Sequence, residues 1–271
     1  MCGLCGFTGE IVDRDAVLEN MTEVITHRGP DSKGFYTDDK ISMGFRRLSI
    51  IDLDNGSQPI YNEDKTLVLM FNGEIYNYKQ LRKELQEKGH VFATDTDSEV
   101  LVHGFEEWRE DLLNRLRGMF GFAIWNRTDE SLFIARDFFG IKPMHYTQVG
   151  GHFLYASEIK SILKFPGFEK KFNYRTLDNY LSFQYAVPPE TFFEGVYCLL
   201  PGHYLWYRDG KVETTRYWEA RFNPDESLTE EQAVDEIEKV FEESVNAHKI
   251  SDVEVGCFLS SGVDSSYVST Y

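Results

Sequence analysis

Basic residues are scarce in this chain. Its 271 residues include 28 Lys and Arg against 45 Asp and Glu, which gives a formal net charge of −17. An excess of carboxylates of this size repels phosphate backbones and anionic membrane surfaces. We therefore expect neither a nucleic-acid partner nor a membrane partner, and we interpret the charge as serving solubility.

Long apolar runs and cysteines are scarce as well. No apolar run approaches the roughly 20 residues that a membrane-spanning helix needs, and the N-terminus lacks the basic and apolar regions of a signal peptide. Four cysteines in a chain of this length do not suggest a disulfide framework. These absences predict a soluble, cytoplasmic protein. The 15 Tyr and 21 Phe indicate strand-rich packing.

Hairpins and intervening helices dominate the first two-thirds of the sequence. The pattern is not a regular alternation of strand and helix, so it predicts an α+β protein with antiparallel sheets covered by helices. The predicted strands are 41–52, 67–71, 118–126, 131–136 and 153–156, and the predicted helices are 78–88, 98–110 and 157–163.

The sequence changes character after residue 217. A polar stretch at 223–227 is typical of a linker, and Thr229 with Gln232 predicts a capping box at the start of a helix. A strand at 253–259 and a turn at 260–266 should follow. This tail is too short to bury a core of its own, so it resembles the first α-β-α piece of a second domain. We assign a first domain to 2–218, a linker to 219–228 and the truncated second domain to 229–271.

Cys2 is the candidate nucleophile. Removal of Met1 would leave its thiol, with a reference pKa of about 8.5, beside a free α-amine of about 7.7 to 8.0. The neutral amine can accept the thiol proton, so the base would come with the nucleophile. Cys5, Cys198 and Cys257 have no such amine, and we expect them to be buried small apolar residues.

Two other interpretations of Cys2 remain open at this point. Cys2 and Cys5 form a C-x-x-C pair, which could be redox-active or half of a zinc site. No second Cys or His pair with metal spacing follows nearby, and we predict no metal. If Met1 is retained, the α-amine of Cys2 is locked in a peptide bond and the chain would be a non-catalytic scaffold.

Other polar residues could serve a thiol that attacks a carboxamide. The Asn72 side chain and the Gly73 N–H could stabilise an oxyanion, although Asn-Gly is also a strong turn signal. Arg47 could hold the α-carboxylate of glutamine, and Glu74 with Asp97 could hold its ammonium group. A surface arginine and a helix-capping aspartate are the simpler alternatives.

Taken together, these segments resemble the class II glutamine amidotransferases of the Ntn type. The matching segments are MCGLCGF at the start, HRGPD at 27–31, RLSII at 47–51, NGE at 72–74 and Asp97. Further segments resemble the glutamine-hydrolysing asparagine synthetases in particular: GMFGFAIWN at 118–126, RDFFGIKP at 136–143, ASEIK at 156–160 and VPPETFFEGVYCLLPG at 187–202.

The resemblance implies a four-layer αββα sandwich of antiparallel sheets with Cys2 as nucleophile and Asn72 and Gly73 as the oxyanion hole. It implies that glutamine is bound by Arg47, Leu48, Ser49, Ile50, Ile51, Asn72, Gly73, Glu74 and Asp97.

SSGVDSS at 260–266 resembles the pyrophosphate loop of an α/β ATP-pyrophosphatase-type domain. The resemblance implies ATP binding by Phe258, Leu259, Ser260, Ser261, Gly262, Asp264 and Ser265. Ser261 replaces the first glycine of the usual S-G-G-x-D-S pattern, and we expect this to be tolerated with less backbone freedom. An ordinary strand–turn–helix is the plain alternative.

The resemblance also implies an activity for the complete enzyme. Ammonia from glutamine would pass to a second site where ATP, with Mg²⁺, activates aspartate for conversion to asparagine with release of AMP and pyrophosphate. The glutaminase half-reaction would need no cofactor. A homodimer is a further expectation. An amidotransferase acting on another carboxylate is the alternative within the family.

Overall fold

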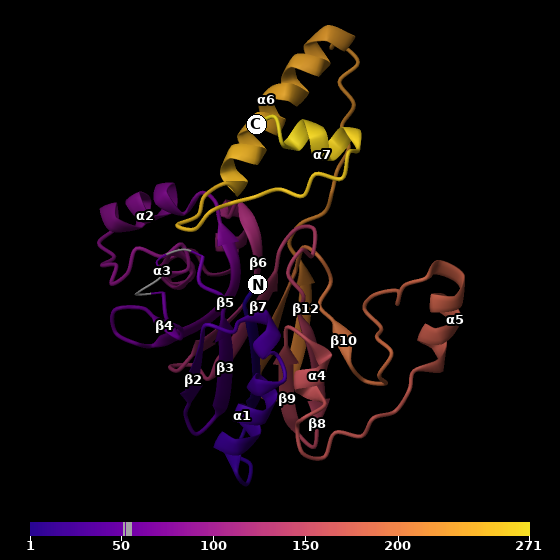
Figure 1. Cartoon of the computed structure of the whole chain (residues 1–271). Coiled ribbons are helices and arrows are strands. Elements are labelled where there is room, and N and C mark those ends of the chain that lie inside the picture. The colour runs from indigo at the N-terminus through magenta and orange to yellow at the C-terminus, as the bar shows by residue number, and fades with distance from the viewer. Residues whose placement is uncertain (51, 53–55) are drawn as a thin grey trace.

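The computed structural model describes residues 1–50, 52 and 56–271 (Figure 1). The strands are β1 (Gly3–Thr8), β2 (Ser32–Thr37), β3 (Ile41–Arg47), β4 (Ile60–Tyr61), β5 (Leu67–Ile75), β6 (Gly118–Asn126), β7 (Ser131–Arg136), β8 (His145–Val149), β9 (His152–Ala156), β10 (Tyr197–Cys198), β11 (His203–Arg208) and β12 (Lys211–Arg216). The helices are α1 (Arg14–Glu23), η1 (Thr26–Arg28), α2 (Tyr78–Glu87), α3 (Glu99–Trp108), η2 (Arg109–Arg115), α4 (Ile159–Ile162), α5 (Tyr174–Phe183), α6 (Glu230–His248) and α7 (Val263–Val268).

Two six-stranded antiparallel sheets form the centre of the molecule. Their strand orders are β10-β8-β9-β1-β3-β2 and β12-β11-β7-β6-β5-β4. One apolar core lies between the sheets, where Phe45 of the first sheet and Met70 and Trp125 of the second are buried. A second core lies under α1 and α4, and a third lies under α2 and α3. The predicted four-layer αββα sandwich is therefore confirmed (Figure 1).

Strand β5 separates two of these cores. Leu69 and Phe71 pack in the core under α2 and α3, whereas Val68 and Met70 pack in the core between the sheets. This alternation follows from the pleat, which turns successive side chains to opposite faces. Asn72 comes two residues after Met70, so it continues the row of side chains that faces the other sheet.

Several predicted elements differ from the structure at their ends. Strand β3 ends at Arg47 rather than at residue 52, because the strands beside it supply no partners beyond Gly3 and Ser32. Strand β5 continues to Ile75 rather than ending at Phe71, because β6 pairs with it along its whole length. The alternative interpretation of Asn72-Gly73 as a turn is therefore wrong, because both residues lie inside β5. The hairpin of β6 and β7 has the predicted bounds.

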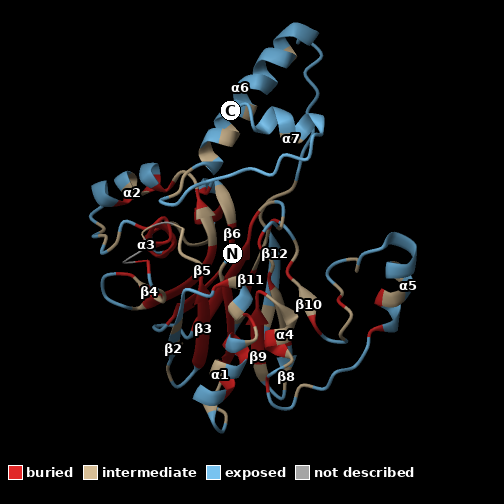
Figure 2. Cartoon of the chain, viewed as in Figure 1, coloured by how far each residue is buried: buried red, intermediate tan, exposed pale blue. Residues whose placement is uncertain are grey.

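The C-terminal segment lies outside the sandwich (Figure 2). The capping box of Thr229 and Gln232 is confirmed, but no residue of α6 or α7 is buried. The strand predicted at 253–259 is wrong, since a strand needs a hydrogen-bonded neighbour and the described residues provide none there. Several contacts link this segment to the sandwich. Asp252 donates its backbone N–H to Ile50 O at 3.0 Å and accepts the Asp52 N–H at 2.7 Å, and the rings of His248 and Tyr76 lie 4.5 Å apart.

Among the described residues, no helix has the length and apolar character needed to cross a membrane.

Candidate active site

A small pocket lies where β3 and β5 approach the N-terminus. Its cavity of about 60 Å³ holds about two water molecules. Eight of the predicted site residues line it, namely Cys2, Arg47, Leu48, Ile50, Asn72, Gly73, Glu74 and Asp97, together with Met1, Gly56, Gln58, Phe71, Thr96, Ser98 and Lys142. Ser49 is not among the lining residues, and Ile51 lies outside the described residues.

The Cys2 thiol is held by the backbone of Leu48. The Leu48 N–H donates to Cys2 Sγ at 3.3 Å, and Sγ lies 3.5 Å from the Leu48 carbonyl oxygen. Burial raises the pKa of the Cys2 thiol, while the Leu48 N–H and the charges of Arg47 and Lys142 oppose that rise. The sulfur therefore sits beside groups that favour its thiolate form.

The HRGPD segment positions both sides of this contact. Arg28 Nε donates to the Cys2 carbonyl oxygen at 2.8 Å, and Asp31 Oδ2 accepts the Ser49 N–H at 2.8 Å. A Cβ atom on Gly29 would lie 2.5 Å from Arg47 N, so only glycine permits this approach. Asp31 and Arg28 thus fix the backbone on either side of the Cys2 thiol.

Asn72 presents a hydrogen-bond donor to the pocket. The side chain is 1% exposed, and its Nδ2 has no hydrogen-bond partner among the described residues. A buried, unsatisfied donor is unfavourable by about 1–3 kcal/mol and is uncommon in native proteins. Next to it, Gly73 has no room for a side chain, because an added Cβ would lie 2.1 Å from Met119 O. Packing between β5 and β6 therefore requires this glycine.

The two candidate ammonium ligands lie on the same pocket wall. Burial, as the main cause, raises the pKa of Asp97 to about 7, and the charge of Glu74 adds to this rise. The Ile75 N–H, which donates to Asp97 Oδ2 at 2.8 Å, opposes it. Burial also raises the pKa of Glu74, against the charge of Lys142. Two partly desolvated carboxylates make a favourable place for a cation.

Arg47 is buried next to Asp52 and Gly56. Its Nη2 donates to Asp52 O at 2.6 Å, and an added Cβ on Gly56 would lie 2.1 Å from the same nitrogen. Gly56 therefore leaves space for the guanidinium, and the guanidinium also lines the pocket. Its planar fork can bind a carboxylate through two hydrogen bonds.

Lys142 is a pocket residue to which the sequence analysis gave no role. It is 4% exposed, and its Nζ lies 3.4 Å from Met1 Sδ. Burial lowers the pKa of Lys142, while the negative charges of Glu74 and Asp137 oppose this. The residue therefore brings a positive charge close to the thiol and the acidic wall.

The turn that carries Lys142 is folded by two charged side chains. Asp137 accepts backbone N–H groups from Ile141 at 2.8 Å and Lys142 at 2.9 Å. Arg136 donates to the carbonyl oxygens of Lys142 at 2.7 Å, Leu199 at 2.6 Å and Gly140 at 2.7 Å. The sequence signal for this turn was the segment RDFFGIKP, in which an adjacent Arg-Asp pair precedes a glycine and Lys142.

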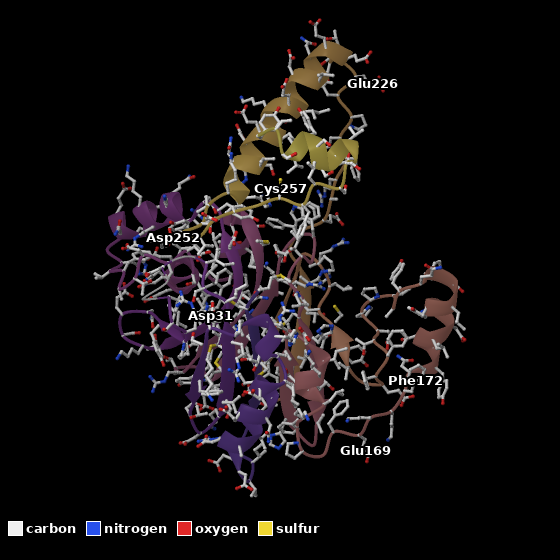
Figure 3. The ribbon with its side chains drawn as sticks, in the orientation of Figure 1. Asp31, Glu169, Phe172, Glu226, Asp252 and Cys257 are labelled. Carbon is white, nitrogen blue, oxygen red and sulfur yellow. The ribbon has the colours of Figure 1, made fainter. Side chains whose placement is uncertain are left out.

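The C-x-x-C pair does not form a joint site. Cys5 packs in the core under α1, whereas Cys2 packs at the core between the sheets. Burial raises the pKa of Cys5 to about 12, so it is an inert thiol. Cys257 was expected to be a buried apolar residue. This prediction is wrong, because Cys257 is exposed on the C-terminal segment (Figure 3).

The predicted ATP-binding residues lie on the exposed C-terminal segment and are not among those that line the pocket. Ser260 Oγ lies 3.0 Å from Ser265 Oγ, which also donates to Gly262 O at 3.2 Å. Ser261 has a φ of 64°, in the left-handed region that glycine adopts freely.

Comparisons with known proteins agree with this geometry. Residues 236–271 match the asparagine synthase family model. Asparagine synthetase [glutamine-hydrolyzing] 1 of Bacillus subtilis (strain 168) is 42% identical, and the match covers 98% of this chain and 43% of that protein. Amidase chyE of Penicillium rubens is 36% identical, and the match covers 96% of this chain and 38% of that protein. The chain thus spans less than half the length of these curated relatives.

The fold also has a match among solved structures. Glutamine phosphoribosylpyrophosphate amidotransferase from B. subtilis superposes with a TM-score of 0.58 at 19% identity, covering 81% of this chain and 50% of that one. A likeness at this identity supports the sandwich fold alone. Residues 1–218 match the model of the glutamine amidotransferase domain, and the chain therefore belongs to the glutamine amidotransferase domain family.

Proposed function

We propose that this chain carries the glutaminase site of a glutamine-hydrolysing asparagine synthetase. The observation that carries the proposal is the buried Asn72 Nδ2, which has no hydrogen-bond partner among the described residues and borders the same pocket as the Cys2 thiol. A donor held ready beside a nucleophile is what an oxyanion requires. The sequence relatives support glutamine as the nitrogen donor.

The reaction begins once Met1 is removed. The α-amine of Cys2 takes the thiol proton, and Sγ attacks the side-chain carbonyl carbon of glutamine. Asn72 Nδ2 and the Gly73 N–H stabilise the oxyanion. The C–N bond then breaks, and the nitrogen leaves as ammonia with the transferred proton. Water hydrolyses the thioester, which releases glutamate and restores the thiol.

Substrate recognition uses the two opposite charges on the α-carbon of glutamine, at the end of the molecule away from the reacting carboxamide. Arg47 binds the α-carboxylate, and Glu74 with Asp97 binds the ammonium group. These three side chains all line the pocket. Leu48, Ile50 and, by the family resemblance, Ser49 and Ile51 would contribute backbone contacts.

The Met1 side chain belongs to the same proposal. It lines the pocket, and the cavity of about 60 Å³ that remains beside it is far smaller than a glutamine molecule. Removal of Met1 therefore frees the α-amine of Cys2 and enlarges the pocket in one step.

The second half-reaction is proposed for the complete protein. Ser260, Ser261, Gly262, Asp264 and Ser265 would hold the pyrophosphate of ATP, since hydroxyl and backbone N–H groups suit phosphate oxygens. Asp264 is a carboxylate of the kind that holds Mg²⁺ together with phosphates, and the ion would neutralise charge on the departing pyrophosphate. Aspartate as acceptor, a cytoplasmic location and a homodimer stay predictions.

A different acceptor carboxylate is the second candidate. It is favoured by the 36% identity to a relative named amidase chyE, whose name specifies no asparagine. Incubation of the longer protein with ATP, glutamine and aspartate separates the two candidates. Asparagine formation supports the first, and consumption of ATP and glutamine without asparagine supports the second.

A glutaminase assay on samples of known intact mass tests the proposed site. Chains without Met1 should release glutamate from glutamine, and chains that retain Met1 should not. Cys2→Ala should abolish the activity, whereas Cys257→Ala, at an exposed thiol outside the pocket, should retain it. Undiminished activity in the Cys2→Ala protein would overturn the proposal.

A further inference from the structure

A cluster of imidazole and carboxylate groups lies away from the glutamine pocket, at the helical face of the second sheet. Glu63 lies between β4 and β5, His90 follows α2, and His103 and Glu106 lie one turn apart on α3. One ligand atom from each residue lies within 4.8 Å of the others. Three separate chain segments therefore bring four metal-binding side chains to one place.

The two imidazoles are oriented in the same way. Nδ1 of His90 lies 3.1 Å from Glu63 Oε1, and Nδ1 of His103 lies 3.2 Å from Glu63 Oε2. Nε2 of His90 faces Glu107 at 3.4 Å, and Nε2 of His103 faces Glu99 at 3.3 Å. In His103 the outer carboxylate of Glu99 can accept the Nε2 proton, which leaves the Nδ1 lone pair available inside, as in carboxylate–histidine–metal arrangements. Nδ1 of His90 shares a hydrogen bond with Glu63 Oε1, and a bound cation would take the place of its proton.

His103 gives independent evidence for a missing ligand. The residue is 1% exposed, and its Nδ1 has no hydrogen-bond partner among the described residues. Glu63 Oε2 lies near this nitrogen but is not placed to make a hydrogen bond with it. A lone pair that faces a carboxylate oxygen is repelled unless a cation or a proton lies between them. The buried nitrogen is thus aimed into the cluster without a partner.

Hydrogen bonds hold the carboxylates in place around the imidazoles. Glu99 Oε2 accepts a hydrogen bond from Thr94 Oγ1 at 2.6 Å, and Glu63 Oε1 accepts the Val91 N–H at 2.8 Å. The cluster therefore gathers carboxylate oxygens around two nitrogen ligands.

We propose that Glu63, His90, His103 and Glu106 bind a divalent cation of the Zn²⁺ class. Two nitrogen and two oxygen ligands suit tetrahedral Zn²⁺, and imidazole disfavours Mg²⁺ and Ca²⁺. Ligands bound at about 2.0–2.2 Å in a tetrahedron are about 3.3–3.6 Å apart. One ligand atom of each residue lies within 4.8 Å of the others, so the side chains would have to close in slightly around the ion. Asn62 Nδ2 donates to Glu106 Oε2 at 3.1 Å and orients the fourth ligand.

The cation would support the loop that carries Asp97. Glu99, which orients His103, also accepts the backbone N–H groups of Ala93 at 2.7 Å and Thr94 at 2.8 Å. Asp97 follows these residues and lines the glutamine pocket. The proposed site is thus structural, and the Glu99 carboxylate connects it to the loop that carries Asp97.

Titration of the metal-free whole chain with Co²⁺, followed by Zn²⁺ competition, tests this inference. The expected result is one equivalent of Co²⁺ with the strong visible absorption of a tetrahedral ion, displaced by Zn²⁺. His90→Gln with Glu106→Gln should abolish this absorption. The matched control, His203→Gln with Glu213→Gln on β11 and β12, should retain it. Zn²⁺ should raise the melting temperature of the unaltered chain by several degrees relative to EDTA.

Three outcomes would overturn the inference. The first is that the unaltered chain binds no Co²⁺ more tightly than the His90→Gln, Glu106→Gln protein. The second is a thiolate absorption that disappears in Cys2→Ala, which would place the cation at the catalytic pocket. The third concerns Glu106→Gln alone, a change at an exposed position that leaves the other three ligands in place; unchanged Co²⁺ affinity in this variant would exclude the four-ligand site.

Discussion

At the scale of single residues, the pocket combines groups that the fold leaves unsatisfied. Asn72 Nδ2 is buried without a partner among the described residues, and Asp97 is a carboxylate whose pKa burial raises to about 7. Both arrangements are unfavourable in the absence of a ligand. A glutamine molecule would satisfy both, because its carbonyl oxygen accepts from Asn72 and its ammonium group offsets the charge of Asp97.

Asn72→Leu should therefore separate stability from activity. A buried donor without a partner destabilises the folded state by about 1–3 kcal/mol. Because the change removes this donor, the free energy of unfolding should stay equal or rise. The loss of one oxyanion donor should lower kcat by about 10²–10³-fold. Urea unfolding and steady-state glutaminase kinetics measure the two effects. A large loss of stability with little change in kcat would assign Asn72 to packing instead.

Asp97 should give glutamine binding a dependence on pH. Its carboxyl group is neutral below a pKa of about 7, and only the ionised form attracts the ammonium group. KM for glutamine should therefore rise as the pH falls through about 7. Asp97→Asn should raise KM by about 10–100-fold, the value of one charged hydrogen bond, and remove this dependence. Persistence of the same KM profile in Asp97→Asn would show that another group titrates.

The same raised pKa has a consequence for stability. A folded-state pKa of about 7 against about 3.9 in the unfolded chain means that the folded state binds more protons between these values. The free energy of unfolding should then fall as the pH rises from about 4 to about 7. Urea unfolding across this range, compared with Asp97→Asn, isolates the contribution, which should be absent from the variant.

At the scale of elements, β5 does more than supply two site residues. Its register with β6 places Gly73 opposite Phe120, and the close approach of the strands excludes any side chain there. An Asn-Gly pair normally predicts a turn, so sequence reasoning found the correct residues within the wrong local structure. Pairing along the whole of β6 overrides the local preference.

Gly73→Ala should destabilise the sandwich as well as the site. The added Cβ would lie 2.1 Å from Met119 O, and relief of such a contact requires the two strands to separate. We expect a loss of about 1–3 kcal/mol or more, measured by urea unfolding. Gly256→Ala is the control, because nothing lies within 4 Å of its added Cβ. Equal stability of the two variants would contradict the strand-packing argument.

Ser261→Gly should relieve backbone strain in the predicted pyrophosphate loop. Ser261 has a φ of 64°, and the left-handed region is unfavourable for a residue with a Cβ by about 1–2 kcal/mol. In the longer protein, the glycine variant should bind ATP as tightly as the parent or more tightly. Equilibrium binding of ATP measures this, and weaker binding by Ser261→Gly would show that the serine hydroxyl itself contacts the nucleotide.

At the scale of the whole molecule, the pattern of hairpins and helices predicted antiparallel sheets covered by helices, and the family resemblance implied the four-layer sandwich. Eight residues expected at the glutamine site line one pocket, and their roles stay predictions. Lys142 was missed because its position depends on the turn that Arg136 and Asp137 fold. The strand at 253–259 was wrong because strands need neighbours, which no single segment reveals. Ser49 is not among the pocket-lining residues, and its N–H is bound by Asp31, a contact between residues distant in sequence.

The alternation along β5 has a consequence for measurement. Asn72, which carries the side-chain donor of the oxyanion hole, continues the row of side chains that fills the core between the sheets, so this wall of the pocket is an extension of that core. Any ligand that fills the pocket should then resist separation of the two sheets and not only of the loops around it. A ligand bound in the glutamine site should accordingly raise the melting temperature of this chain, and heat-induced unfolding should detect such binding without any enzymatic turnover.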